Sequence, residues 1–134
     1  MPNIFTYGSL MYPEVFDQVA GAPHQRLTAT LRDWRRHQLT GQTYPAATPA
    51  AGHTIQGVLW LDVGTQALAR LDAFETRSYD RQPVQVSTDN GSPINAEIYR
   101  WLDLSQLLEQ DWSPAQFETL HLKDFFRIYG QAIE

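Results

Sequence analysis

The sequence predicts an α+β fold built on a small mixed, mostly antiparallel, barrel-like sheet of five to seven strands flanked by helices. One strand and one helix are followed mainly by strands with helices inserted, which is the element order of that class. The dipeptide Asn90-Gly91 joins two alternating segments, and such a pair favours a hairpin because it tolerates positive φ. At 134 residues and 43% hydrophobic content, residues 1–134 are expected to form a single domain with its own core.

The first third of the chain predicts three strands and one helix. Asn3–Tyr7 is a short apolar segment that ends at Gly8. Pro13–Ala20 is expected to be helical, because proline suits the first turn and Gly21 is placed to end the helix. Two loosely alternating segments predict the other strands, Arg26–Leu31 and Arg35–Thr40.

The middle of the chain predicts a loop, a strand and a helix. Residues 45–52 are rich in Pro, Ala and Gly and are expected to form an irregular loop. Ile55–Val63 is the clearest strand, with Gly57 indicating a bulge or a close backbone approach. Thr65 is expected to cap the helix that follows. The apolar positions of this helix are Leu68, Leu71 and Phe74, at near-helical spacing.

The last part of the chain predicts a hairpin and a C-terminal helix. Arg81–Ser87 and Ile94–Trp101 are the strands around Asp89-Asn90-Gly91. The helix begins at Ser113-Pro114, where Ser113 can cap and Gln116 lies three residues on. Trp112 and Phe117 have the spacing of a hydrophobic staple. The expected buried stripe of this helix is Phe117, Leu120, Phe125, Ile128 and Ala132.

Charge and composition narrow the range of functions. The formal net charge is −5, and the longest basic cluster is Arg32, Arg35 and Arg36, so nucleic acid and anionic membranes are not expected partners. The absence of cysteine excludes thiol catalysis, disulfides and thiolate metal sites. No signal peptide or transmembrane segment is evident, so a cytoplasmic location is expected. The sequence does not indicate an oligomeric state.

Histidine and serine patterns give no catalytic constellation. The four histidines are scattered without ligand spacing, so no metal site is expected. They are His24, His37, His53 and His121. Ser9 lacks the Gly-x-Ser-x-Gly context of a nucleophile, so a serine hydrolase has little support.

Tyr7-Gly8-Ser9 is the first stretch that could form part of a functional site. It lacks the spacing of a P-loop or a dinucleotide fingerprint. A single glycine in such a turn can still present several backbone N–H groups to a small anion. The alternative interpretation is a plain turn at the end of a strand.

Glu75 is the second candidate. It follows Phe74 at the expected end of a helix, where the helix dipole disfavours an acid. An unfavourable field beside aromatic rings raises the pKa of a carboxylate, which suits a general base near neutral pH. The alternative is an exposed glutamate paired with Arg77 or Arg81.

Together these stretches resemble the gamma-glutamylcyclotransferase-like family, in particular its small branch with the plant avirulence-induced proteins. The motifs follow in order over about residues 4–101. They are Tyr7-Gly8-Ser9-Leu10, Tyr44-Pro45-Ala46, Ile55-x-Gly57-x-Leu59-Trp60, Leu71-Asp72-x-Phe74-Glu75, Tyr79-x-Arg81 and Ala96-Glu97-Ile98-Tyr99. The chain departs from the family at Thr76, where many members have glycine, and at Met11-Tyr12, where many small bacterial members have a basic residue and glycine.

The resemblance implies a cyclotransferase that converts a γ-glutamyl compound into 5-oxoproline and a free amine, without cofactor or metal. Glu75 falls at the position of the catalytic acid. Residues 7–10 fall on the substrate-binding loop. The other implied site residues are Tyr99, which would contact the substrate, and Tyr44, Tyr79 and Arg81, which would support the site.

Two other interpretations stay open. The same cavity could serve a related γ-glutamyl acyl-transfer or deblocking reaction, or the chain could be a non-catalytic binder of a small molecule. The presence of both the Tyr-Gly-Ser-Leu stretch and Glu75 favours an enzyme. The amine part of the substrate does not follow from the sequence.

Overall fold

The computed structural model describes residues 1–41 and 44–120, which form six strands, three α-helices and three 3-10 turns. The strands are β1 (Ile4–Thr6), β2 (Arg26–Leu39), β3 (Pro45–Trp60), β4 (Tyr79–Thr88), β5 (Pro93–Trp101) and β6 (Leu107–Asp111). The helices are α1 (Pro13–Ala20), α2 (Thr65–Glu75) and α3 (Pro114–Leu120). The 3-10 turns are η1 (Ser9–Met11), η2 (Thr76–Ser78) and η3 (Leu104–Gln106).

Five strands close into a small mixed barrel. The hydrogen-bonded order is β3-β1-β5-β4-β2, and pairing of β2 with β3 completes the ring. The short β1 runs parallel to β5, and the other pairs are antiparallel. The sixth strand, β6, extends the sheet beside β2. The predicted fold class, a mostly antiparallel barrel-like sheet with flanking helices, is confirmed.

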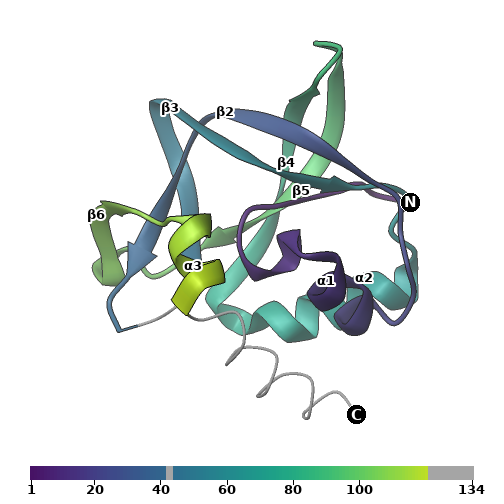
Figure 1. The fold of residues 1–134 in the computed structure, drawn as a ribbon, viewed down its shortest axis with the longest axis horizontal. Coiled ribbons are helices and arrows are strands. Elements are labelled where there is room, and N and C mark those ends of the chain that lie inside the picture. Colours follow the sequence, from purple (N-terminus) through teal and green to yellow (C-terminus); the bar gives the residue numbers. More distant parts are fainter. Residues whose placement is uncertain (42–43, 121–134) are drawn as a thin grey trace.

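Helices α1 and α2 lie together below one end of the barrel, and the β4–β5 hairpin projects from the opposite side (Figure 1). Helix α1 has the predicted bounds, and Gly21 ends it with a φ of 85°. Helix α2 also forms where expected. The prediction that Thr65 caps it is wrong, because Gly64 occupies the N-cap position and no side chain bonds there.

Two predictions for the long strands are wrong. Arg26–Leu31 and Arg35–Thr40 are parts of one strand, β2, with a register shift between Arg32 and Trp34 where Asp33 has a φ of 65°. Residues 45–52 are not a loop but the first half of β3, which then ends at Trp60 rather than at Val63. This half pairs with β2 in regular register, for example Arg36 with Ala47.

The C-terminal elements are partly as expected. The Asn90-Gly91 hairpin joins β4 to β5, and Gly91 has a φ of 79°. Strand β6 was not predicted. Helix α3 begins at Pro114, and the rings of Trp112 and Phe117 lie 5.4 Å apart, as a staple requires. The expected stripe positions Phe125, Ile128 and Ala132 lie outside the described residues, as does the side chain of Leu120.

Side chains of β1 and of the residue after it belong to two different apolar clusters. Ile4 faces α1 and α2, whereas Phe5 and Tyr7 belong to the cluster inside the barrel. On the helical side, Phe16 stacks on Trp60 with a centroid distance of 4.0 Å. Gly57 confirms a close backbone approach, because a Cβ there would lie 2.3 Å from the carbonyl oxygen of Thr6. The barrel therefore holds the end of β1 in a fixed place.

Candidate active site

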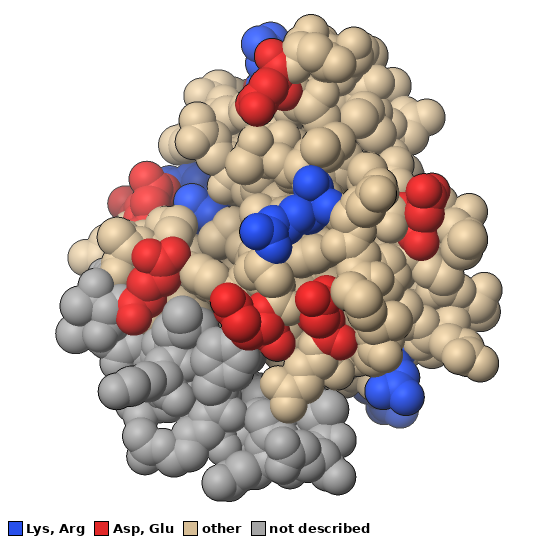
Figure 2. Space-filling model, turned by 45° about the vertical axis from the view of Figure 1, so that its right-hand side comes forward, with Lys and Arg blue, Asp and Glu red and all other residues tan. Residues whose placement is uncertain are grey.

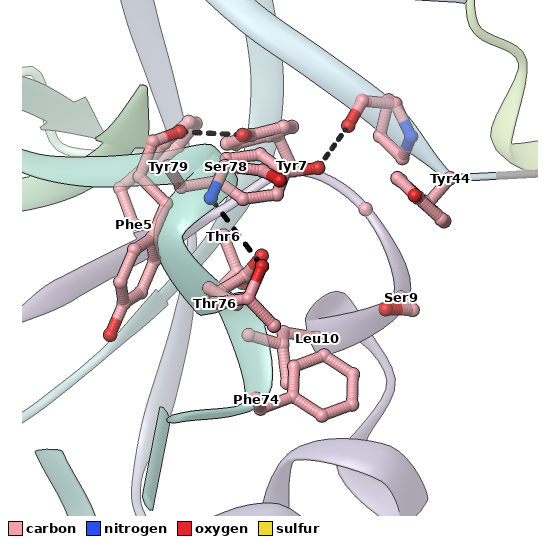
Figure 3. A pocket seen from close by; sticks show the side chains of 14 residues that line it. Phe5, Thr6, Tyr7, Ser9, Leu10, Tyr44, Phe74, Thr76, Ser78 and Tyr79 are labelled. Carbon is pink, nitrogen blue, oxygen red and sulfur yellow. Dashed lines mark hydrogen bonds between the residues drawn. The ribbon is translucent and has the colours of Figure 1, made fainter. Parts of the chain in front are cut away.

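A pocket of about 110 Å³ lies where β1 runs into η1 and where α2 ends. Figure 3 shows Ser9 and Tyr44 on one side of it and Phe74 and Thr76 on the other. Its lining is Phe5, Thr6, Tyr7, Gly8, Ser9, Leu10, Tyr44, Pro45, Phe74, Glu75, Thr76, Ser78, Tyr79 and Tyr99. The only ionisable acid or base among these side chains, apart from the tyrosines, is Glu75.

The structure brings together eight of the nine residues expected at the site. They are Tyr7, Gly8, Ser9, Leu10, Tyr44, Glu75, Tyr79 and Tyr99. Arg81 does not line this pocket. It lines a neighbouring hollow with Asp72 and Asp80, and this hollow shares Thr76, Tyr79 and Tyr99 with the main pocket.

Several hydrogen bonds fix the Tyr7–Leu10 loop. The Tyr7 hydroxyl donates to the carbonyl of Tyr99 at 2.5 Å. At the other end of the loop, the indole N–H of Trp60 donates to the carbonyl of Leu10 at 3.1 Å. Within it, the N–H of Met11 bonds the carbonyl of Gly8. No backbone hydrogen bond donated by the N–H of Ser9 or Leu10 is found in the described part of the chain, so both amides are candidate donors to a ligand.

Gly8 is required by packing. A Cβ at this position would lie 2.8 Å from two ring carbons of Pro45. The glycine therefore lets the start of β3 pack directly against the loop, beside the pocket.

Glu75 is the last residue of α2, and Thr76 after it turns the chain sharply. Thr76 has φ 66° and ψ −171°, a region almost reserved for glycine. Its N–H still bonds the carbonyl of Asp72, closing the helix. The helix end thus places the carboxylate of Glu75 in the pocket wall at the cost of backbone strain.

The environment of Glu75 favours its protonated form. Burial, together with the smaller effect of the negative charge of Asp72, raises the pKa of Glu75 to about 8. Asp72 precedes Glu75 by three positions on α2, so the two carboxylates lie on one face of the helix. A carboxyl group with this pKa exchanges protons readily near neutral pH.

The hydroxyl protons of Tyr7 and Tyr99 are already used. Tyr99 donates to a carboxylate oxygen of Asp72 at 2.7 Å, and the guanidinium of Arg81 bonds the same oxygen at 2.9 Å. Burial is the main reason that the pKa values of both tyrosines are raised well above the ordinary value. Both rings therefore serve as neutral walls of the pocket.

Tyr79 and Tyr44 flank the pocket from β4 and from the start of β3. The Tyr79 hydroxyl donates to the carbonyl of Pro45 at 2.9 Å, and its ring packs edge-on against Trp101. Tyr44 packs in the small cluster of Leu39, Ala46 and Trp101. Both tyrosines therefore connect the pocket to the small cluster of Leu39, Ala46 and Trp101.

Sequence reasoning gave no role to Asp72 or Trp60, although both contact site residues. Asp72 stands in the Leu71-Asp72-x-Phe74-Glu75 motif, and its i, i+3 spacing to Glu75 was an available signal. The bond from Trp60 to the loop had no comparable signal, because β3 and η1 meet only in the folded chain.

Charges of both signs alternate on the face drawn in Figure 2, and no continuous basic stripe crosses its described part. In residues 1–41 and 44–120, no helix has the length and apolar character needed to span a membrane.

Residues 4–114 match the family model described as gamma-glutamyl cyclotransferase, AIG2-like. AIG2-like protein D of Arabidopsis thaliana is 30% identical over 137 residues, covering 100% of this chain and 90% of the relative. An Arabidopsis protein solved in solution has 26% identity and a TM-score of 0.72, covering 96% of this chain and 87% of that one.

A solved structure named gamma-glutamyl cyclotransferase is also similar. It has a TM-score of 0.67 and 19% identity, over 96% of this chain and 86% of that one. At this identity the likeness concerns the fold.

Proposed function

We propose that this chain, which belongs to the gamma-glutamyl cyclotransferase, AIG2-like family, converts a small γ-glutamyl amine or amino acid into 5-oxoproline and the free amine. One observation carries the proposal. Glu75 and the Tyr7–Leu10 loop, which are far apart in the sequence, line the same pocket.

The reaction is an intramolecular aminolysis. The α-amine nitrogen of the substrate attacks its own γ-carbonyl carbon, a C–N bond closes the five-membered ring, and the C–N bond to the leaving amine breaks. Well-oriented intramolecular reactions reach effective molarities of about 10⁵ M or more. The protein therefore needs to hold the glutamyl chain curled and to move protons from the attacking nitrogen to the leaving one.

The loop amides hold the glutamyl carboxylate in this proposal. Ser9 and Leu10 present N–H groups that donate no described backbone hydrogen bond, and both residues line the pocket. Backbone N–H groups gathered in a turn bind small anions well. Because Trp60 fixes the Leu10 carbonyl and Tyr7 is tied to β5, the amides are held in position before the substrate arrives.

Glu75 carries the protons. Its carboxylate takes a proton from the α-ammonium, which frees the amine to attack, and delivers it to the nitrogen of the leaving amine. The attacking nitrogen loses a second proton by the same route as it becomes the lactam N–H, so the amine departs as an ammonium ion. An α-amino group titrates near pH 8, so a carboxyl group with a pKa of about 8 is matched to it, whereas an ordinary glutamate near 4 is not. No step of this mechanism calls for a metal or a cofactor.

The remaining residues shape and support the site. Tyr7, Tyr99, Tyr44 and Tyr79 form aromatic walls that exclude water from the curled substrate. Arg81 acts one step away, because it bonds Asp72, which in turn accepts from Tyr99 and influences Glu75.

The test is product formation from a panel of γ-glutamyl dipeptides and γ-glutamyl-ε-lysine, with 5-oxoproline measured by mass spectrometry. We expect Glu75→Gln to lower kcat by about 10²–10⁴-fold, since it removes the proton carrier but keeps the shape. Glu14→Gln makes the same change at an exposed position of α1 and should leave the rate unchanged.

Two results would count against the assignment. Full activity of Glu75→Gln would remove Glu75 as the base. Absence of product from every substrate, together with tight binding of a γ-glutamyl compound, would favour a non-catalytic binding protein.

A further inference from the structure

Arg36, on β2, contacts the Tyr7–Leu10 loop. One guanidinium nitrogen, Nη1, donates to the carbonyl of Tyr7 at 3.0 Å and to the carbonyl of Gln56 at 3.3 Å. The face of the group lies over the ring of Trp112, 5.3 Å from its centroid. Arg36 does not line the pocket, so it has no place in the mechanism given above.

The guanidinium of Arg36 has no carboxylate partner in the part of the chain that the structure describes. The neighbouring Asp111 bonds Arg35 instead, at 2.9 Å. Arg36 is only partly exposed, and its burial lowers the pKa of the guanidinium from the ordinary value. The negative charge of Asp111 acts on the Arg36 guanidinium without a hydrogen bond to it, so the positive charge beside the loop is only partly compensated.

The peptide between Tyr7 and Gly8 connects this charge to the pocket. The carbonyl that accepts from Arg36 and the N–H of Gly8 belong to one planar unit. A hydrogen bond from a cation to a carbonyl is strong and polarises the peptide, which makes its N–H a better donor. The same contact fixes the plane of the peptide from which the loop continues to Ser9.

We propose that Arg36 is a positioning residue that gives the Tyr7–Leu10 loop its preference for an anionic group, acting through the Tyr7 carbonyl and its own positive charge. This inference rests on the proposed function, because it assumes that the loop holds the carboxylate of the glutamyl unit or of 5-oxoproline. Arg36 supplies the positive charge that the pocket lining itself lacks.

The experiment compares binding of 5-oxoproline with binding of its neutral carboxamide, measured by titration calorimetry on the full chain. Arg36→Met removes the charge and keeps a long stem against Trp112. We expect this variant to lower the affinity for 5-oxoproline by about tenfold, because one charge-assisted interaction is lost. The affinity for the carboxamide should change by less than about twofold. Arg36→Lys keeps the charge and should retain most of the affinity.

Arg35→Met is the matched control. Arg35 is the adjacent residue of β2, but it bonds Asp111 and the carbonyl of Glu109, away from the loop. This variant should bind both ligands like the wild type. If Arg36→Met does not give a native thermal unfolding curve, Arg36→Gln is the second neutral variant and carries the same expectation.

The inference is overturned if a folded neutral variant binds 5-oxoproline as tightly as the wild type. It is also overturned if the affinities for 5-oxoproline and for the carboxamide fall by the same factor. Wild-type protein that binds neither ligand also overturns it. The proposed function has its own readout. Turnover of a γ-glutamyl substrate, with KM raised and kcat within about threefold in Arg36→Met, supports both. Turnover with unchanged KM removes only the role of Arg36.

Discussion

Two unfavourable features stand at neighbouring residues where α2 ends. Thr76 adopts a backbone conformation almost reserved for glycine, and the carboxylate of Glu75 is held where its pKa is raised to about 8. Each feature lowers the stability of the folded state. Strain and perturbed pKa values concentrate at functional sites, where the surrounding structure compensates for them. Their coincidence in one pocket wall supports a catalytic role for Glu75.

The pH dependence of kcat/KM tests the electrostatic link between Asp72 and Glu75. The base accepts a proton only when ionised, so activity should rise as pH increases through the pKa of Glu75, about 8. Asp72→Asn removes a negative charge that helps to raise this pKa. We therefore expect the acidic limb of the profile to move to lower pH in this variant.

Asp80→Asn is the control for that profile. Asp80 lines the neighbouring hollow but pairs with Arg100 at 2.9 Å, and it is not among the charges that raise the pKa of Glu75. The ionisation of the free substrate is common to all variants, so only an enzyme group can shift the limb between them. An equal shift in both variants would refute a specific role for Asp72.

The backbone strain at Thr76 leads to a separate prediction. Glycine adopts the same φ and ψ without penalty, so Thr76→Gly should raise the free energy of unfolding by about 1 kcal/mol after its own entropy cost. Urea denaturation measures the change. Thr54→Gly, in the extended exposed part of β3, should lower it by a similar amount. A loss of stability in Thr76→Gly would contradict the strain.

At the scale of elements, local signals predicted the short elements well. Pro13 and Gly21 mark the two ends of α1, and Asn90-Gly91 marks the hairpin, because each of these residues acts through its own backbone. The loop and Glu75 were identified through family motifs. Arg36 was not, since its contact with Tyr7 depends on how β2 curves around the barrel.

The first half of β3 shows where local signals fail. Pro45 and Pro49 lower the expectation of a strand, since proline cannot donate to the ladder. Among the described residues this half pairs only with β2, because β1 reaches β3 at Val58–Trp60. A strand with one hydrogen-bonded side tolerates proline. The proline-rich composition of residues 45–52 is therefore compatible with a strand that has a hydrogen-bonded neighbour on one side. No local sequence pattern encodes the absence of a second neighbour.

The crossing of β3 and β1 makes Gly57 sensitive to substitution. A Cβ at Gly57 would lie 2.3 Å from the Thr6 carbonyl and 2.7 Å from the Phe5 ring. We expect Gly57→Ala to lower the free energy of unfolding by at least about 2 kcal/mol, since β1 must move away from β3. Gly64→Ala is the control, because its Cβ would meet only a Met1 sulfur at 3.5 Å. Equal unfolding midpoints for the two variants would contradict the close approach.

For the molecule as a whole, the barrel and the helices each supply one side of the pocket. The loop is tied to the barrel through Tyr7 and Trp60, whereas Glu75 comes from α2. The apolar clusters inside the barrel and under the helices meet at β1, directly before the loop. The core of the protein therefore sets the distance between Glu75 and the Tyr7–Leu10 loop. Activity should be lost when the packing of this core is lost.

The stability of the whole protein should depend on pH through the ionisation of Glu75. Its pKa is raised in the folded state from 4.5 to about 8, so folding favours the protonated group. The associated stability is fully present below pH 4.5, is lost as pH rises through 8, and changes no further above that value. Glu75→Gln removes this loss, so its free energy of unfolding should exceed that of the wild type by as much as about 4 kcal/mol at pH 8.

Urea denaturation of both proteins between pH 5 and pH 9 measures this difference. The gap should widen steadily up to about pH 8, the pKa of Glu75, and then stay constant. Glu14→Gln, at an exposed position, should show no such trend. A constant gap across the range would mean that Glu75 titrates normally, and the match between its pKa and that of the substrate amine would then be lost.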